Sequence, residues 1–507
     1  MIEPGRTFTK DVSLDVDAVV VGSGAGGSVA ARELARAGLR VVVLEEGGHH
    51  VPADFDQRED HMLPLLFQDG GGRATDDLAI RVLQGRGVGG STIHNTNLCK
   101  RTPDAILDLW ADKYGVVGAR PSDMVPAFER IERELSVVPI EKHQVNANNG
   151  KLLAGIDALG WKGGTLAHNR VGCRGSGYCE LGCAYDAKQN ASKVVLPEAE
   201  SLGATIHPDV RVTRILVDDG KVAGVVGVAT DARGAPRAMV RVRARVVVLA
   251  ASAVGSAALA LASGIRDPHS QIGRNLRMHP GAVVAGRFDE EIVGHRGIPQ
   301  SAECTEHLSF EEGSDRRVWI VPAFAHPIGT ASTLPGFGAR HMTAMRSYRN
   351  LAVLTAMVHD ETRGQVTVED DRPKIRYRME EPDRVQLAKG LVACARILFA
   401  AGAKEVTIPA IPSVVLRNAK ELDALDTSFV RPHGVPMTAV HPMGTMRMGE
   451  DPRSSVVRST GEHHFVRGLF VLDGSLFPTS LGGPPQVSIY SFSLHLVPHA
   501  VARAKAA

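Results

Sequence analysis

Short valine-rich runs alternate with glycine-rich turns at the start of the chain. The runs at 17–22 and 39–44 have the length and composition of buried strands, and residues 28–37 between them have the length of a helix. A strand, a helix and a second strand in this order predict a βαβ unit that opens the protein.

A third apolar stretch, 246–265, is almost uncharged and approaches the length of a membrane-spanning helix. It begins with the valine-rich run at 246–249 and then changes to small residues at 251–256. This change of composition predicts a buried strand, a tight turn and a helix rather than a membrane span.

Later apolar positions predict sheets of another kind. β-branched runs at 210–217 and 221–228 indicate an antiparallel meander, and alternating apolar and polar positions at 318–324 and 351–358 predict strands with one buried face. Residues 486–504 predict a C-terminal helix. Because 507 residues exceed one hydrophobic core, we expect two domains.

Charge and composition exclude some partners. The 58 Lys and Arg nearly balance the 56 Asp and Glu, which leaves a formal charge of +2 and no block of like charge that would bind nucleic acid. Residues 1–17 mix acids and bases without the apolar core of a signal peptide. We therefore expect a cytoplasmic protein with no transmembrane segment.

The first turn carries a dinucleotide-binding pattern. Gly22, Gly24 and Gly27 form G-x-G-x-x-G after the first strand. The first glycine permits the tight turn, the second lets the backbone approach a pyrophosphate, and the third lets helix and strand pack closely. The helix N-terminus adds N–H donors for the anion. Glu45, at the end of the second strand, is placed to hold a ribose. This pattern fits NAD and FAD equally.

Further motifs, in order along 17–504, resemble those of the glucose-methanol-choline (GMC) oxidoreductase family. They are Gly85 to Thr92 with Asn95, Gly273 to Leu276 with His279, His441 to Met448, and Leu472 to Ser475 with Pro478 and Thr479. The resemblance implies FAD as the cofactor. It also implies an α/β fold, in which a Rossmann-like FAD-binding domain joins a second, α+β substrate domain built on an antiparallel sheet.

On this basis we place the N-terminal part of the FAD-binding domain at 1–284, including a cysteine-rich loop at 165–195. The substrate domain would occupy 285–435, and the FAD-binding domain would return at 436–507 with the catalytic histidine and the final helix. The cofactor domain is therefore expected to be assembled from both ends of the chain.

The resemblance also implies which residues contact FAD. Beyond those of the first turn and Glu45, they are Arg86, Gly90, Ser91, His94, Asn95, Val212, Asp473 and Pro485. Structural roles stay open for two of them: turn capping for Ser91 and core packing for Val212. Pro485 suits the start of a helix whose positive end would face the flavin.

His94 has two interpretations. It stands where some members resembling this chain join a histidine covalently to the 8α-methyl carbon of the flavin. Other members keep a packed histidine beside the dimethylbenzene ring at that place. The first interpretation predicts covalent FAD, and the second predicts FAD that denaturation releases.

His441 is the expected catalytic base. The resemblance implies oxidation of a CH–OH group of a small organic alcohol by hydride transfer to flavin N5, and the first residue of the H-P-M-G-T segment takes the hydroxyl proton in similar members. A neutral imidazole suits that proton near neutral pH.

The family pairs this histidine with a later Asn or His, but here Pro484 stands at that place and offers no side-chain polar group. The partner must come from elsewhere or be absent. Gln486, Tyr490 and His495 are nearby in sequence, and helical geometry singles out none of them.

Three cysteines, Cys173, Cys179 and Cys183, fall within eleven residues. Soft sulfur ligands suit an iron–sulfur cluster or zinc. The spacing resembles the trio that holds a cluster in FAD-dependent glucose and fructose dehydrogenases of the family. A reduced, structural cysteine loop is the alternative.

Three functions therefore compete. The first is an FAD-dependent dehydrogenase or oxidase acting on CH–OH, with dioxygen, a quinone or a cytochrome as electron acceptor. The second is a non-redox or light-driven lyase or decarboxylase, which Pro484 favours. The third is an iron–sulfur-relayed dehydrogenase subunit, suggested by the cysteines. The apolar middle section hints at a lipid-like, terpenoid or sterol alcohol.

Overall fold

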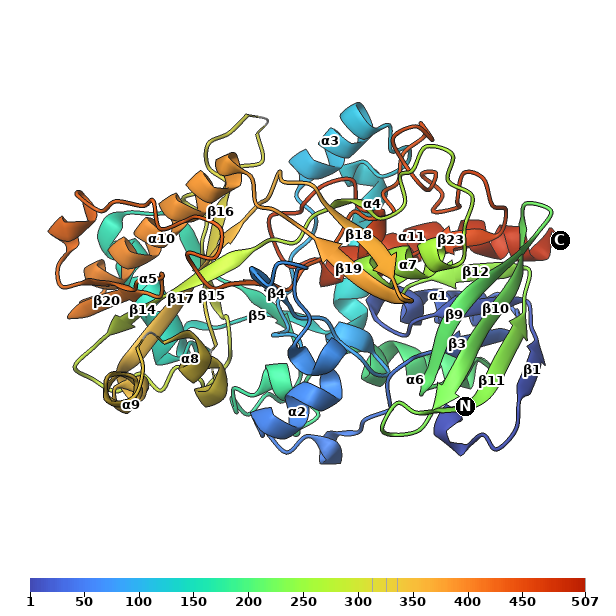
Figure 1. The fold of residues 1–507 in the computed structure, drawn as a ribbon, viewed down its shortest axis with the longest axis horizontal. Coiled ribbons are helices and arrows are strands. Elements are labelled where there is room, and N and C mark those ends of the chain that lie inside the picture. The colour runs from blue at the N-terminus through green and yellow to red at the C-terminus, as the bar shows by residue number, and fades with distance from the viewer. Residues whose placement is uncertain (312, 325, 335, 507) are drawn as a thin grey trace.

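Two large sheets organise the protein, one at each end of the elongated molecule in Figure 1. The computed structural model describes residues 1–311, 313–324, 326–334 and 336–506. A parallel sheet with its helices forms one half, and a mainly antiparallel sheet forms the other. Segments from both ends of the chain contribute to the parallel half.

The parallel sheet is built around the predicted βαβ unit. Its strand order is β23 (Leu469–Val471), β12 (Val246–Leu249), β2 (Ala18–Val21), β3 (Val41–Leu44) and β8 (Thr205–His207). The three central strands are buried at every position, which explains their continuous apolar runs, because both faces of a parallel sheet are covered. This arrangement confirms the Rossmann-like fold.

Helices α1 (Ala25–Arg36) and α7 (Ser252–Ala262) follow the central strands, as the change of composition predicts. The C-terminal helix α11 (Gln486–Lys505) packs along α1, although the two are far apart in sequence (Figure 1). Three further helices belong to the half of the molecule that contains the parallel sheet: α3 (Asp104–Tyr114), α4 (Pro121–Glu134) and α6 (Leu196–Ser201).

The predicted meander lies beside the parallel sheet. Its strands are β9 (Val210–Asp218), β10 (Lys221–Thr230) and β11 (Pro236–Arg243), and β1 (Val12–Asp15) adds to β11 in parallel. Two smaller sheets connect the halves. They comprise β13 (Arg274–Leu276), β18 (Gly364–Glu369) and β19 (Arg372–Arg376) in one, and β5 (Val137–Pro139) and β7 (Ala167–Asn169) in the other.

The second large sheet has nine strands. Its main order is β21 (Val414–Leu416), β20 (Glu405–Ile408), β14 (Gly281–Arg287), β17 (Leu351–Val358), β16 (Val318–Pro322), β15 (Ala302–Cys304) and β6 (Gly163–Thr165), with β22 (Met437–Ala439) and β4 (Ile80–Val82) beside it. Helices α10 (Glu381–Ala400) and α5 (Ala147–Leu159) pack against it. The remaining helices are α2 (Glu59–Leu66), α8 (Pro327–Thr333) and α9 (Ala339–Arg346).

This sheet crosses the predicted domain boundaries. The division between 284 and 285 falls inside β14, and strands β4, β6 and β22 come from outside 285–435. Backbone pairing brings these strands together across long sequence separations, which a contiguous division cannot express. The division into 1–284, 285–435 and 436–507 therefore remains an approximate prediction.

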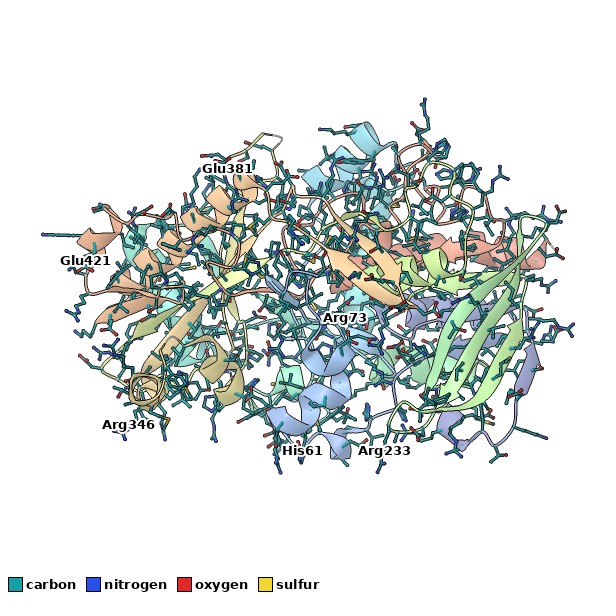
Figure 2. The ribbon with its side chains drawn as sticks, in the orientation of Figure 1. His61, Arg73, Arg233, Arg346, Glu381 and Glu421 are labelled. Atoms are coloured by element: carbon teal, nitrogen blue, oxygen red, sulfur yellow. The ribbon has the colours of Figure 1, made fainter. Side chains whose placement is uncertain are left out.

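Charged side chains are spread around the periphery. Figure 2 shows His61, Arg233, Arg346 and Glu421 at the outer edge of the molecule. Within the described residues, no helix combines the length and the apolar character needed to cross a membrane.

Gly26 provides a test of the packing between α1 and the chain that follows β23. A Cβ at Gly26 would overlap the carbonyl oxygen of Leu472, whereas a Cβ at Gly150 in α5 meets no atom within 4 Å. We expect Gly26→Ala to lower the thermal midpoint by several degrees and to reduce FAD content. Gly150→Ala should instead add about 0.5–1 kcal/mol of helix stability.

Thermal unfolding, with FAD absorbance as a second readout, measures both variants. Equal midpoints for Gly26→Ala and the unchanged protein would contradict the close packing.

Candidate active site

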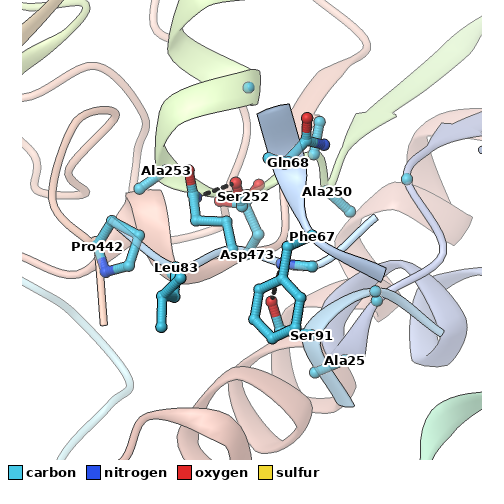
Figure 3. A pocket seen from close by; sticks show the side chains of 18 of the residues that line it. Ala25, Phe67, Gln68, Leu83, Ser91, Ala250, Ser252, Ala253, Pro442 and Asp473 are labelled. Carbon is cyan, nitrogen blue, oxygen red and sulfur yellow. Dashed lines mark hydrogen bonds between the residues drawn. The ribbon is translucent and has the colours of Figure 1, made fainter. Parts of the chain in front are cut away.

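A cavity of about 910 Å³ lies where the two halves meet. Both glycine turns, strand β9, the segment around His441 and the start of α11 contribute to its wall. Figure 3 shows Asp473, Ser252 and Ser91 around one part of it, with Phe67, Leu83 and Pro442 nearby. Polar groups from the Rossmann half and apolar groups from the second sheet therefore share one cavity.

Glu45 joins the two glycine turns. One carboxylate oxygen accepts hydrogen bonds from the Ser23 N–H at 3.1 Å and the Ser23 hydroxyl at 2.7 Å. The other accepts from the N–H groups of Gly47 at 3.0 Å and Gly87 at 3.1 Å. Burial raises the pKa of Glu45. The carboxylate thus has a structural function in addition to the ribose contact predicted for it.

The close approach of the turns leaves no room for side chains. A Cβ at Gly90 would lie 2.9 Å from the Cα of Gly24, and Gly22 has a φ of +98° that favours glycine. Ser91 accepts a hydrogen bond from the Gly85 N–H at 2.8 Å, which closes the second turn. Ser91 therefore has the predicted capping role and still faces the cavity.

Asp473 lies at the C-terminal motif, next to the first glycine turn. It accepts hydrogen bonds from the Ser256 hydroxyl at 2.5 Å and the Ser475 N–H at 2.8 Å, and burial raises its pKa. The adjacent backbone of Leu472 packs against Gly26 of α1. Asp473 is therefore held firmly beside the N-terminus of α1.

These features fit FAD. Glycines hold a backbone cradle at the N-terminus of α1, which suits a pyrophosphate. Glu45 and Asp473 supply carboxylates, and Val212 of β9 lines the cavity at its edge. Most of the residues predicted to hold the cofactor line this cavity, and Gly26 lines it as well.

Two predicted cofactor residues do not line the cavity. Gly27 packs instead against the Gly22 carbonyl, which matches its predicted role in helix packing. The guanidinium of Arg86 turns towards Glu46 and is partly exposed. Its contact with FAD therefore stays a prediction. The other predicted residues, Gly22, Gly24, Glu45, Gly90, Ser91, His94, Asn95, Val212, Asp473 and Pro485, all line it.

His94 is buried at the cavity and packs on Phe67, with ring centroids 4.0 Å apart. Burial lowers its pKa to about 3, so the ring is neutral. Its Nε2 has no hydrogen-bond partner among the described residues, and a Cβ on Gly85 would lie 2.6 Å from it. Nε2 therefore points at the Gly85 backbone.

His441 lines the same cavity as the glycine turns and lies beside His279. The Nδ1 atoms of the two rings are 3.2 Å apart, and burial lowers the pKa of His441 to about 3. His279 was part of a recognised motif but was not predicted as a site residue. Their proximity depends on tertiary structure, because 162 residues separate them.

Pro484 and Gln486 lie at the start of α11 and line the cavity, while Tyr490 and His495 do not. Gln486 accepts a hydrogen bond from the Asn95 side-chain amide at 2.8 Å and donates to the Leu98 carbonyl at 2.6 Å. Its amide oxygen therefore holds Asn95, and its NH₂ group holds the backbone of Leu98. It does not replace the missing polar partner of His441 directly.

The cysteine loop is tied to the cavity by a buried lysine. Lys188 donates hydrogen bonds to the carbonyls of Ile93, Asn95 and Cys179. The loop also brings Glu180 to the cavity wall, where burial raises the pKa of its carboxyl. Neither residue was predicted, because an isolated Lys or Glu in a loop carries no motif.

The thiols themselves are engaged in local contacts. Cys173 and Cys183 accept backbone hydrogen bonds, and burial raises the pKa of Cys179 to about 12. In the described part of the chain, no group of three or more Cys, His, Asp or Glu side chains could hold a metal ion. The metal-ligand prediction for these cysteines therefore gains no support from the side-chain geometry.

Comparisons with known proteins agree with this geometry. Models of the GMC oxidoreductase N- and C-terminal regions match residues 63–281 and 360–493, and a model of an NAD(P)-binding Rossmann-like domain matches 20–52. An uncharacterized GMC-type oxidoreductase of Mycobacterium tuberculosis is 35% identical over 96% of this chain and 76% of its own length. This chain belongs to the GMC oxidoreductase family.

Other relatives of this GMC oxidoreductase have named activities. A long-chain-alcohol oxidase of Arabidopsis thaliana is 30% identical over 95% of this chain and 68% of its own length. The solved structure of a pyridoxine 4-oxidase from Mesorbium loti has a TM-score of 0.73 at 19% identity, over 95% of this chain and 98% of that one. The likeness to that structure supports the fold alone.

Glu45 generates a test of the cofactor cradle. In Glu45→Gln an amide NH₂ replaces one oxygen and would face at least one backbone N–H donor, leaving it unpaired in a buried site. Because each buried unpaired group costs about 1–3 kcal/mol, we expect FAD affinity to fall at least about tenfold.

Titration of the apoprotein with FAD, followed by flavin fluorescence, measures this change. Glu129→Gln is the matched control, because Glu129 is exposed on α4 and does not line the cavity. Similar affinity in both variants would show that the Glu45 contacts are unimportant.

Proposed function

We propose that this FAD-dependent GMC oxidoreductase oxidises a CH–OH group of a small organic alcohol with an apolar body. The observation that carries the proposal is the position of His441, which lines the same cavity as the two glycine turns. FAD, when bound, supplies N5 as the hydride acceptor. An imidazole at this place can act on the hydroxyl that becomes a carbonyl.

The expected role of His441 as base requires a lone pair directed at the substrate. A neutral imidazole offers a lone pair on one nitrogen and an N–H on the other. The position of the ring hydrogen therefore determines whether His441 accepts the hydroxyl proton or donates a hydrogen bond to the oxygen. Either role places His441 at the reacting oxygen.

The cavity wall supports an apolar substrate body. Trp319 of β16 and Met357 of β17 are directly paired in the second sheet, and both side chains reach the cavity. Leu98 and Val440 line it as well. Contact with these side chains would supply binding free energy for an apolar substrate body. The long-chain-alcohol oxidase relatives agree with this class of substrate.

Anaerobic mixing with a panel of alcohols tests the proposal. We expect aliphatic or terpenoid alcohols to bleach the oxidised flavin, and sugars to bleach it slowly or not at all. His441→Ala should slow bleaching at least about 100-fold, which is the usual contribution of a group acting on the transferred proton. Stopped-flow absorbance of the flavin measures the rates.

The unchanged protein with bound FAD and no alcohol is the control. A protein that binds FAD but is bleached by none of the alcohols would favour the lyase or decarboxylase instead.

We also propose that His94 packs against FAD without a covalent bond. Its unpartnered Nε2 points at the Gly85 backbone rather than into open cavity, which supports this interpretation. We expect acid denaturation to release all of the yellow colour into the supernatant. Flavin that stays with the precipitated chain, and that His94→Ala releases, would establish the bond.

A further inference from the structure

Two segments hold the rings of His279 and His441 in contact, edge to face. Arg277 and Met443 exchange two backbone hydrogen bonds, each 2.9 Å long, in an antiparallel bridge. His279 follows Arg277 by two residues and His441 precedes Met443 by two, so the same register places them opposite each other. Their contact is therefore built into the backbone pairing.

The backbone of His279 is anchored independently. The buried Asp360 carboxylate accepts hydrogen bonds from the N–H groups of Met278 at 2.9 Å and His279 at 3.2 Å, and from the Tyr377 hydroxyl at 2.8 Å. His279 also has a φ of +50°, a conformation that a non-glycine residue rarely adopts without such support. The ring of His279 consequently has a defined position.

The hydrogen of the His279 ring can be assigned from its neighbours. Its Nε2 receives the N–H groups of Gly482 at 2.9 Å and Leu481 at 3.2 Å. Backbone N–H groups are donors only, so Nε2 must be the acceptor and carry no hydrogen. A neutral imidazole has one N–H, which in His279 is therefore on Nδ1.

This assignment determines the hydrogen of His441. The Nδ1 atoms of the two rings are 3.2 Å apart, so His279 Nδ1–H donates to His441 Nδ1. That nitrogen uses its lone pair to accept, and the hydrogen of neutral His441 lies on Nε2. Burial lowers the pKa of both rings, which agrees with two neutral imidazoles near pH 7.

We infer that His279 is a positioning residue that fixes His441 as the Nε2–H tautomer, so that His441 donates a hydrogen bond to the substrate oxygen. The identity of that oxygen rests on the proposed function, whereas the tautomer is a property of the protein. In the oxidation, two electrons leave the carbon with the hydride to flavin, and the hydroxyl proton goes to a water molecule. The expectation of His441 as base is thereby revised.

The direct test is ¹⁵N NMR of the FAD-loaded protein with labelled histidine and no substrate. Protonated and unprotonated ring nitrogens give well-separated resonances, and His441→Gln identifies those of His441 by their loss. We expect a hydrogen on His441 Nε2 and none on Nδ1. A hydrogen on His441 Nδ1 would overturn the inference, whatever the substrate is.

Two variants of His279 separate positioning from simple packing. In His279→Gln the amide oxygen can accept from the two backbone N–H groups and the NH₂ can donate to His441, so the Nε2–H tautomer should persist. In His279→Glu both oxygens accept, so the hydrogen of His441 should move to Nδ1. A tautomer that is the same in both variants would contradict the inference.

Folding of each variant is checked by FAD content and the thermal midpoint. His143→Gln, at an exposed histidine away from the cavity, is the matched control and should leave the His441 resonances unchanged.

Activity then distinguishes a donor from a base. Gln at position 441 can donate a hydrogen bond but cannot accept a proton as a base. With an alcohol that bleaches the flavin, we expect His441→Gln to retain a kcat about tenfold higher than His441→Ala, the usual value of a restored hydrogen bond. Equal loss in both variants would overturn the donor role. Failure of every alcohol would contradict the proposed function and leave the NMR result intact.

Discussion

The approach of two glycine turns to one buried carboxylate is the constraint on which the cofactor cradle depends. Glu45 accepts four hydrogen bonds from the two turns and the chain beside them. This arrangement requires that strand β3 end just before Glu45. It also requires glycine at positions 24 and 90, where the two backbones nearly touch. Buried N–H groups without that carboxylate would be unpaired, so the cradle and the fold stabilise each other.

The second sheet completes the site from the opposite side. One face of this sheet packs against helix α10. On the other face, the paired side chains of Trp319 and Met357 reach the cavity. The segments of His279 and His441 are joined by the backbone bridge between Arg277 and Met443. This bridge links the N-terminal part of the chain with the part that returns after residue 436. The contact between the two histidines is thus set by backbone register, which side-chain rotation cannot easily disturb.

Much of the fold could be predicted because its signals are local. The valine runs, the glycine spacing and the small residues after 249 each specify a buried strand, a tight turn or a helix within a few residues. The family motifs added FAD and His441. The domain boundaries were less predictable, since β4, β6 and β22 enter the second sheet through pairings that no local pattern records.

By itself, the sequence determined the Rossmann unit, the cofactor class and the candidate residues, because each depends on spacing within one segment. Only the tertiary structure decided which polar groups meet: it set Gln486 against Asn95, turned Arg86 towards Glu46 and placed His279 opposite His441. The physical reason is that a hydrogen bond needs its two atoms within about 3 Å. For groups more than a hundred residues apart, only the packing of the sheets and helices fixes such a distance.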